Sequence, residues 1–287
     1  MAIGDATRIN TNIGAFNALN ALKSINRMLE KSQLRLATGR RINEVADDPA
    51  GFVISTRLNA RSRGLSTALD NIGTAKNVLS IAEGGLLNIS DILVTMKEKV
   101  TQAASDTLGS AERNAIKTEL DQLTAEINNI VDETTFNNIS LIDGNYRNKS
   151  IQTGEDTTNT LEINIVRQGT TSSGFKAADL EVDISNVSTL VFTAAGSSMA
   201  LSRIDSAIEV ISDALQNIGA LISRMTVKES TLSIAITNTE GTRSRIMDVD
   251  IAREQLESTK LQILQQTATV QLAQANITPQ NILALFT

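Results

Sequence analysis

The fold is decided by the stretch LNARSRGLSTALDNIGTAKNVLSIAEGGLLNISDILVTMKEKV, residues 58–100, in which aliphatic side chains recur every seven residues. The recurring set is Leu58, Leu65, Ile72, Leu79, Leu86, Leu93 and Val100. A second set follows its later members by three residues and consists of Ala68, Ala75, Ala82, Ile89, Met96 and Ala103. This a/d pattern predicts a long coiled-coil helix, whose alanine layers let a partner helix approach closely.

Two more helical stripes supply partners for that helix. They comprise Ile116, Leu120, Leu123, Ile127 and Ile130, and then Leu201, Ile204, Ile208, Ile211, Leu215, Ile218, Ile222, Met225, Leu232 and Ile236. Ser110 is the predicted N-cap of the first stripe. Burying the seven a positions of the long helix gains roughly 10–20 kcal/mol. Ordering its residues costs about 1 kcal/mol or more each, so no helix is stable alone.

The composition suits a helix bundle. Hydrophobic residues make up 41% of the 287 residues but aromatic residues only 2%, so Leu, Ile, Val and Ala must form the core. Pro49 and Pro279 are the only prolines, so long stretches contain no residue that breaks a helix. Residues 141–200 are instead rich in Gly, Ser, Thr and Asn, and their alternating runs Leu161–Ile165 and Leu180–Ile184 predict short strands of a β-hairpin region.

The residue inventory argues against catalysis. The chain has no histidine and no cysteine, so the usual general base, the commonest metal ligand and any thiolate are missing. We therefore expect no catalytic residues, no cofactor and no metal. A net charge of −6 argues against nucleic-acid binding.

Charge and polarity at the two ends raise the question of a membrane. The first 41 residues carry seven basic and two acidic side chains, which is compatible with a membrane-binding helix or with a solvated face or subunit contact, and we favour the latter. MAIGDATRIN lacks the apolar region of a signal peptide. Residues 261–287 are uncharged, but their six Gln and two Asn make them too polar for a membrane span.

The two ends of the chain carry stripes of their own. Ala15, Leu19, Leu22, Ile25 and Leu29 form one helical face. Near the other end, Val249, Leu256, Ile263, Val270 and Ile277 recur every seven residues. Their d positions are Ala252, Thr259, Gln266 and Ala273, which would make a poor core for a monomer. We therefore expect other subunits to complete this seam.

Several segments of this chain match the sequence of one known family. RRINEVADDPAGFVIS, residues 40–55, has Asp47 or Asp48 as a cap and Pro49 in the first helical turn, and it resembles the N-terminal signature of the bacterial flagellins. SRIMDVDIAREQLESTKLQILQQTATVQLAQANITPQNILALF, residues 244–286, resembles the C-terminal region over its whole length. RINTN at 8–12, TFNN at 135–138 and LIDG at 141–144 also match, so the resemblance covers roughly 1–145 and 200–287.

The resemblance implies an architecture. The fold is expected to be mainly α, an elongated antiparallel coiled coil or helix bundle with a small β-hairpin region mid-chain. Residues 1–44 with 241–287 would form a terminal coiled-coil domain lining the filament core. Residues 45–240 would form a rod-like domain that includes the hairpin region at about 141–200, with no large outer domain.

The resemblance also implies a function: a structural subunit, secreted without a cleaved signal peptide, that polymerises into the extracellular flagellar filament. Its partners would be itself, an export chaperone through the C-terminal helix, the flagellar export apparatus, and the filament cap and hook junction proteins, with no nucleic acid and no membrane insertion. The expected assembly residues are Ile9, Ile13, Phe16, Leu19, Leu22, Leu256, Ile263, Val270, Ile277, Leu283 and Phe286. The alternative is a hook–filament junction protein with similar termini. A filament-borne zinc protease would need the His-Glu-x-x-His motif, which a chain without histidine lacks.

One motif departs from the family. Members that are detected by the vertebrate innate receptor resemble one another in a Gln-Arg pair followed by Glu-Leu on the first long helix. The corresponding positions are Val94, Thr95, Glu98 and Lys99, of which only the glutamate matches. The resemblance therefore implies weak detection by that receptor.

Overall fold

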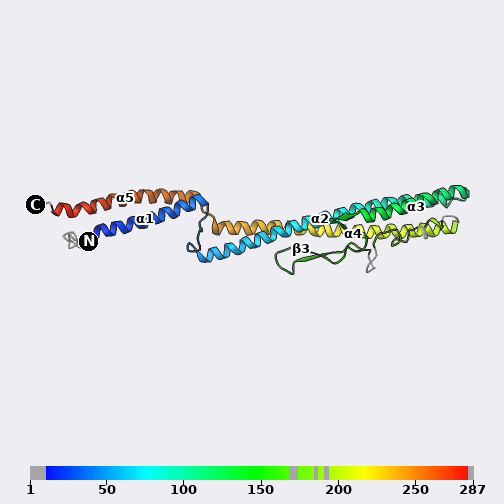
Figure 1. The fold of residues 1–287 in the computed structure, drawn as a ribbon, viewed down its shortest axis with the longest axis horizontal. Coiled ribbons are helices and arrows are strands. Elements are labelled where there is room, and N and C mark those ends of the chain that lie inside the picture. The colour runs from blue at the N-terminus through cyan, green and yellow to red at the C-terminus, as the bar shows by residue number, and fades with distance from the viewer. Residues whose placement is uncertain (1–10, 168–173, 184–186, 191–193, 284–287) are drawn as a thin grey trace. The chain divides into compact units, whose positions relative to one another are not determined.

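The computed structural model describes residues 11–167, 174–183, 187–190 and 194–283, and their elements are mainly helical. The helices are α1 (Ile13–Thr38), α2 (Pro49–Ala103), α3 (Ser110–Glu133), α4 (Ala194–Met247) and α5 (Ile251–Leu283) (Figure 1). The chain divides into two compact units: a terminal unit, Met1–Ala60 with Asn238–Thr287, and a central unit, Arg61–Thr237. The predicted mainly α fold with a small hairpin region is confirmed, whereas the predicted domain boundaries stay a prediction.

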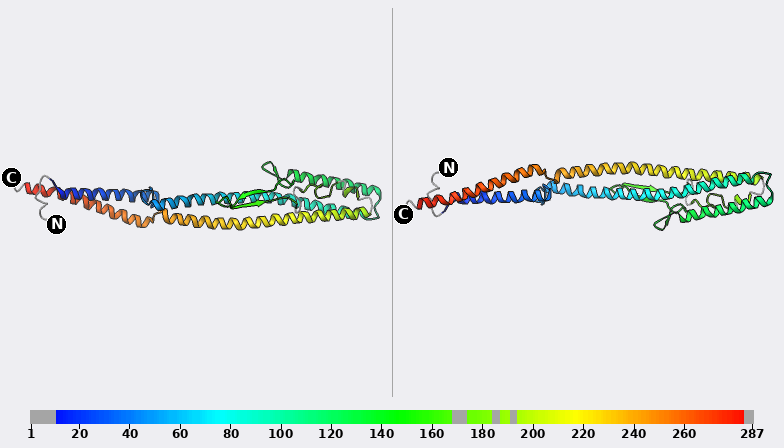
Figure 2. Two further views of the ribbon diagram at one scale, coloured as in Figure 1. Left: turned by 90° about the horizontal axis from the view of Figure 1, so that it is seen from below. Right: turned by 90° about the horizontal axis from the view of Figure 1, so that it is seen from above.

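In the central unit, α2 packs against α3 and α4 (Figures 1 and 2). The ion pairs Lys76–Glu229 and Lys97–Asp205, at 2.8 and 2.6 Å, join α2 to α4. Because the residue numbers of the two partners run in opposite directions, these two helices are antiparallel. The pair Lys99–Glu119, at 2.7 Å, joins α2 to α3.

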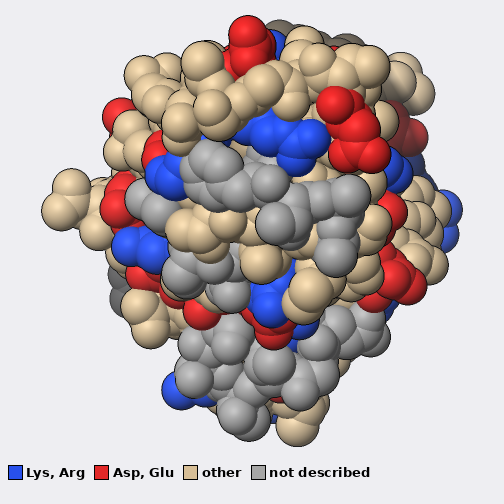
Figure 3. Space-filling model, turned by 90° about the vertical axis from the view of Figure 1, so that its right-hand side faces the viewer, with Lys and Arg blue, Asp and Glu red and all other residues tan. Residues whose placement is uncertain are grey.

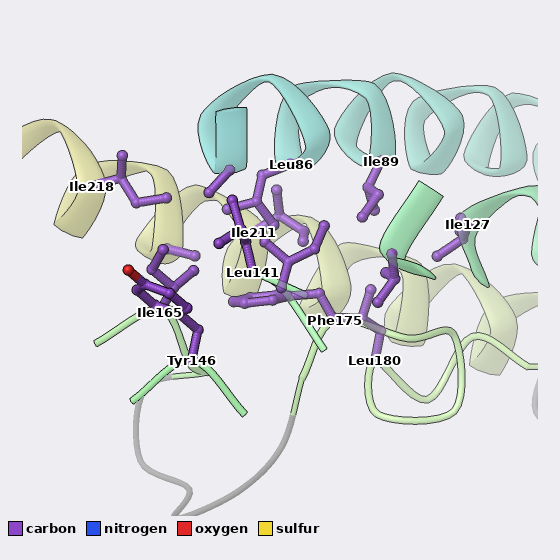
Figure 4. Packing of buried hydrophobic residues seen from close by; sticks show 14 of the residues in the cluster. Leu86, Ile89, Ile127, Leu141, Tyr146, Ile165, Phe175, Leu180, Ile211 and Ile218 are labelled. Atoms are coloured by element: carbon purple, nitrogen blue, oxygen red, sulfur yellow. The ribbon is translucent and has the colours of Figure 1, made fainter. Parts of the chain in front are cut away.

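The heptad of α2 forms the core, as predicted. All a positions from Leu65 to Val100 and all d positions from Ala68 to Ala103 are buried. Figure 4 shows Leu86 and Ile89 of α2 facing Leu141 and Phe175. Gly85 allows a close approach here, because a Cβ at this position would lie 2.6 Å from Thr134 Oγ1. The stripe of α4 is confirmed too, since Ile204, Ile211, Ile218, Met225 and Leu232 are buried.

The strands lie between α3 and α4 as two antiparallel hairpins. In the first, β1 (Thr135–Phe136) and β2 (Ile139–Ser140) flank Asn137 and Asn138, whose φ angles are 49° and 64°. Two left-handed residues are what the tight I′ hairpin turn requires, and asparagine adopts that conformation readily. In the second, β3 (Lys149–Gln152) pairs with β4 (Thr160–Ile163), with Ile151 opposite Leu161.

Two local predictions are wrong. The run Leu180–Ile184 is no strand over its described residues 180–183, because Val182 N–H donates to Ala177 O and closes a turn. Its alternation arose because Leu180 and Val182 are both buried while Glu181, with φ 60°, points outward. Ser110 is not the N-cap of α3: that position is Gly109, and no side chain caps the helix there.

One long helix and one face of the surface bear on the membrane and nucleic-acid alternatives. One described helix, α2, is long and apolar enough to cross a membrane by length and composition alone. Its apolar heptad, however, is buried against other helices of the chain. Figure 3 shows acidic and basic side chains interspersed on one face, unlike the continuous basic face that binds a phosphate backbone.

Candidate assembly site in the terminal unit

The terminal unit is built on α1 and α5, which lie side by side and antiparallel (Figures 1 and 2). The α1 face predicted from Ala15, Leu19, Leu22, Ile25 and Leu29 points into this pair, with Leu29 buried and the other four half-buried. Among residues 251–277 of α5, the buried ones are Ser258, Leu261 and Ala268. Ser32 of α1 is buried too, and its hydroxyl donates to Glu254 O at 3.5 Å. The seam is narrow, and much of it is small or polar.

Polar contacts fix how α1 and α5 align. Gln265 Nε2 donates to Asn26 Oδ1 at 2.8 Å near the middle of the seam. Toward the far end, Asn12 Nδ2 donates to Ala275 O at 2.7 Å, while Asn12 Oδ1 caps α1 by accepting from Ala15 N. A polar pair inside a helix seam specifies one register, because any slip leaves both groups unsatisfied.

Hydrogen bonds connect the loop that follows α1 to the loop that follows α4, and we call this contact the joint. Gly39 ends α1 with φ 68°, a left-handed C-cap that favours glycine. Its carbonyl accepts from Val249 N at 3.0 Å, and Arg41 N donates to Met247 O at 2.6 Å. The Arg41 guanidinium adds two hydrogen bonds to Ile246 O, at 3.2 and 2.8 Å. Chain segments about 200 residues apart therefore meet at this joint.

The loop before α2 is held by two adjacent aspartates with different partners. Asp48 Oδ1 accepts from Gly51 N at 2.9 Å, so Asp48 caps α2 as predicted, with Pro49 in its first turn. Asp47 instead pairs with Lys31 Nζ at 2.5 Å and accepts from Asn43 N at 3.0 Å. The hydrogen bond from Lys31 is the main cause that lowers the pKa of Asp47 from 3.8 to about 2, against the opposing effect of burial.

These contacts also show how part of the basic N-terminal region is used. Lys31 binds Asp47, and Arg41 binds the end of α4. Arg35 lies 3.9 Å from Glu254 of α5. Three of the cations that suggested a membrane surface therefore have partners inside the terminal unit.

The seven-residue stripe of α5 faces away from α1. Leu256, Ile263, Val270 and Ile277 are 74, 59, 68 and 44% exposed. The four d positions predicted beside this stripe, Ala252, Thr259, Gln266 and Ala273, are exposed as well. These large aliphatic side chains form an exposed row, and the sequence carries no charge between Leu261 and Leu283.

The other predicted assembly residues fall into three groups. Phe16 is 59% exposed on α1, whereas Ile13, Leu19 and Leu22 are half-buried. Leu283 is the last residue of α5. Ile9 and Phe286 lie outside the described residues.

Sequence reasoning missed the stripe of α5 that contacts α1. It consists of Glu254, Ser258, Leu261, Gln265, Ala268, Leu272 and Ala275, all of them buried or half-buried. The alternating spacing of four and three residues was a usable signal, but its small and polar members made it weaker than the aliphatic row on the opposite face.

The receptor-motif positions lie on α2 in the central unit. Val94 and Glu98 are exposed, and Thr95 is half-buried with its hydroxyl donating to Asp91 O at 3.0 Å. Lys99 is held by its ion pair with Glu119. Among the described residues, no cluster of three or more acidic side chains could hold a metal ion.

Helices that carry an exposed apolar row beside a narrow internal seam define a class of protein: the α-helical structural subunit. Comparison with known families gives the particular one. Residues 9–147 match the bacterial flagellin N-terminal helical region, and residues 201–286 match the bacterial flagellin C-terminal helical region. The chain belongs to the bacterial flagellin family.

Two curated relatives are similar over nearly the whole chain, and a solved structure shares the fold of most of it. A flagellin of Bacillus subtilis is 34% identical, over 97% of this chain and 99% of that one. A flagellar filament 33 kDa core protein of Treponema phagedenis is 30% identical, over 96% and 99%. A putative flagellar hook-associated protein from Vibrio parahaemolyticus shares the fold, with a TM-score of 0.60 at 17% identity, over 70% of this chain and 100% of that one. The chain is a flagellin subunit of the flagellar filament, and nothing favours the hook-junction alternative.

Proposed function

We propose that this flagellin polymerises through its terminal helix pair, with the outward stripe of α5 as the principal contact between copies. The observation that carries the proposal is the exposure of Leu256, Ile263, Val270 and Ile277 at heptad spacing on a helix whose other face already binds α1. The exposed row contributes no buried apolar surface to the stability of a monomer, whereas a polymer would bury it once for every subunit.

The free energy gained by burying the α5 row would be large enough to favour a polymer. Moving a side chain of this size from partial exposure to full burial contributes about 1–2 kcal/mol. Burial of all four side chains in each subunit would therefore favour the assembled protein over the free monomer by several times that free energy. If the row meets a different surface on the next copy, the contact is heterologous, and it propagates as an open helix when the rotation between copies does not close a ring.

Within such a filament, residues 1–44 with 241–287 would form the terminal domain lining its core, and residues 45–240 the domain outside it. The buried seam of α5 and its exposed row support this assignment, because a helix covered on two sides suits the inner layer of a tube. Before assembly, an export chaperone would cover the same α5 row. The export apparatus, the filament cap and the hook junction proteins would be the further partners. The lack of histidine and cysteine supports a non-catalytic role.

The test is seeded elongation of purified monomer with filament fragments, followed by electron microscopy. Ile263→Asp and Val270→Asp should abolish elongation, because burying an unpaired carboxylate costs several kcal/mol per subunit. Gln262→Asp is the matched control, since Gln262 is also exposed but lies beside the row. Normal filaments from either stripe variant would refute the proposal. Failure of the parent protein to extend the seeds would contradict polymerisation through this helix pair.

We also propose weak detection by the innate receptor. Thr95 lacks the planar guanidinium of the family motif, and Lys99 puts a charge, held by Glu119, where the motif has leucine. Thr95→Arg with Lys99→Leu should raise the signal in a reporter-cell assay, measured beside a strongly detected flagellin. Parent potency equal to that flagellin would contradict the proposal.

A further inference from the structure

The central unit contains a cavity beside α2, outside the terminal helix pair. It has a volume of about 460 Å³ and is lined by residues of α2, of the β1–β2 hairpin and of the segment 146–152. Ala75, Val78 and Tyr146 line it and are buried, whereas Ile139 lines it and is 48% exposed. A cavity of this volume falls within the range of small-molecule sites.

The hydroxyl of Tyr146 has no partner within the chain. Tyr146 is only 9% exposed, yet its side chain forms no hydrogen bond to any residue that the structure describes. A buried phenol ordinarily finds a partner, because an unsatisfied polar group is costly. Figure 4 shows the hydroxyl oxygen, in red, on the side of the ring away from Phe175. Burial raises the pKa of Tyr146 above its ordinary 10.0, so the hydroxyl keeps its proton and can donate.

Two amide groups that line the cavity have free acceptor oxygens. Asn71 Nδ2 donates to Gln152 O at 3.3 Å, and Gln152 Nε2 donates to Gly154 O at 2.7 Å and to Asp156 O at 2.5 Å. These contacts engage both amide nitrogens. Asn71 Oδ1 and Gln152 Oε1 accept no hydrogen bond from the part of the chain that the structure describes. The cavity therefore offers two oriented acceptors and one hydroxyl.

The rest of the lining is uncharged and largely apolar. Among the described lining residues there is no Asp, Glu, Lys or Arg. Val78, Phe136 and Ile151 supply apolar surface. A charged ligand would lose its hydration here without gaining an opposite charge. The occupant should accordingly be neutral, with an apolar face and several hydroxyl or amide donors.

We propose that this cavity binds a neutral pyranose sugar. Its ring C–H face would lie against Val78 and Ile151, and its hydroxyl groups would donate to Asn71 Oδ1 and Gln152 Oε1 and accept from Tyr146. A free monosaccharide and the terminal residue of a glycan present the same chemistry. A bound peptide is the competing occupant, but specific protein partners usually cover about 800 Å² on each side, far more than this cavity offers. The proposal does not depend on how the protein polymerises.

Tyr146 itself reports on the site. The chain has one tyrosine and no tryptophan, so the intrinsic fluorescence of the full-length monomer comes from Tyr146 alone above the weak phenylalanine emission. The probes are L-rhamnose, a 6-deoxyhexose whose methyl group extends the apolar face, and methyl α-L-rhamnopyranoside. Titration should give a saturable change with a Kd of about 1 mM. Glycerol has hydroxyl groups but no ring face, and it should give none.

Saturation-transfer NMR on the same samples detects binding even if the tyrosine emission does not change. Binding of both probes would identify the terminal residue of a glycan as a ligand, whereas binding of rhamnose alone would identify the free sugar. If neither probe binds by either method at up to about 100 mM, the proposal is wrong.

Substitutions place the sugar in the cavity. Thr74 lines the cavity and is exposed, so Thr74→Phe should block it and weaken binding at least about tenfold. Thr67→Phe is the matched control. Thr67 lies one heptad earlier on α2, is also exposed, and like Thr74 donates to the carbonyl four residues before it, at 3.1 Å in both cases. Parent affinity in Thr74→Phe would overturn the site, and Thr74→Met replaces this variant if helical circular dichroism falls.

Tyr146→Phe separates binding from stability. Loss of the hydroxyl should weaken binding about threefold to tenfold by saturation-transfer NMR. The melting temperature should not fall, because the hydroxyl has no described partner to lose. Unchanged affinity would remove the hydroxyl from the site and contradict the proposed binding mode.

Assembled filaments supply the last test. Sugar binding is measured again after seeded elongation, and it should persist if the cavity belongs to a sugar. Loss of the signal on assembly would show that a second copy fills the cavity, and the assignment to a sugar would then be wrong. Neither result bears on the α5 row, which Ile263→Asp tests separately.

Discussion

In α2 and in α5, large aliphatic residues recur every seven positions, but the two helices use them in opposite ways. The α2 set from Leu65 to Val100 is buried by α3, α4 and the hairpin region, whereas the α5 set from Leu256 to Ile277 is exposed. The α5 face that does pack inside the chain is the narrower row containing Ser258 and Ala268. Heptad spacing therefore places large aliphatic side chains on one face of a helix, but it does not say whether the same chain buries that face.

The largest effect should come from deleting residues 261–287. Loss of this segment removes Ile263, Val270 and Ile277 together with most of the seam to α1, so elongation should be abolished. The central unit keeps its own core and should remain folded and helical. Circular dichroism measures whether the central unit stays helical, and seeded elongation measures whether assembly is lost. If the deleted protein still forms filaments of normal length and diameter, the exposed row of α5 is not needed for assembly.

A pair of single substitutions sharpens the comparison. Leu86→Ala leaves a cavity in a fully buried layer and should lower the free energy of unfolding by about 2–5 kcal/mol. Ile263→Ala removes a side chain that is already exposed in the monomer and should change that free energy by less than about 0.5 kcal/mol. Urea denaturation of the monomer gives both values. Equal losses would mean that the α5 row is covered inside one chain.

Limited proteolysis compares the units directly. The seam between α1 and α5 has few fully buried side chains, so residues 1–40 and 245–287 should open and be cleaved first in dilute monomer. A resistant fragment near 45–240 should remain, and mass spectrometry would identify its ends. Assembly into filaments should protect both ends. Termini as resistant as the central unit in free monomer would contradict this order.

The smallest effect concerns the loop before α2. The pKa of Asp47 is lowered to about 2 in the folded protein from an ordinary 3.8, so its ion pair stabilises the fold above pH 3.8. That stabilisation is lost as the pH falls from 3.8 through about 2. Because the Lys31 side chain is 46% exposed, solvent screening limits it to about 1 kcal/mol. Lys31→Met should flatten this part of the stability curve in acid titrations, and an unchanged curve would assign the acid response to other carboxylates.

The sequence predicted long-range periodic features well and local ones less well. The core of α2 and α4 followed from aliphatic spacing, because burial of such rows dominates helix packing. The cap at Asp48 and Pro49 followed from local chemistry. The run at Leu180–Ile184 failed since alternate residues can be buried by a turn as well as by a strand. The inner row of α5 was missed because Ser258, Gln265 and Ala268 carry little hydrophobic signal, and only the position of α1 makes them a seam.

The pairing of the first described helix with the last has a consequence for how the protein is made. About 210 residues separate the end of α1 from the start of α5, so a ribosome adding 5–20 residues per second needs roughly 10–40 s between them. During that interval α1 has no partner. A chain interrupted anywhere before α5 also lacks both the seam and the exposed row. If the α5 row is the contact between copies, as proposed, only chains synthesised to the end of α5 can enter the filament.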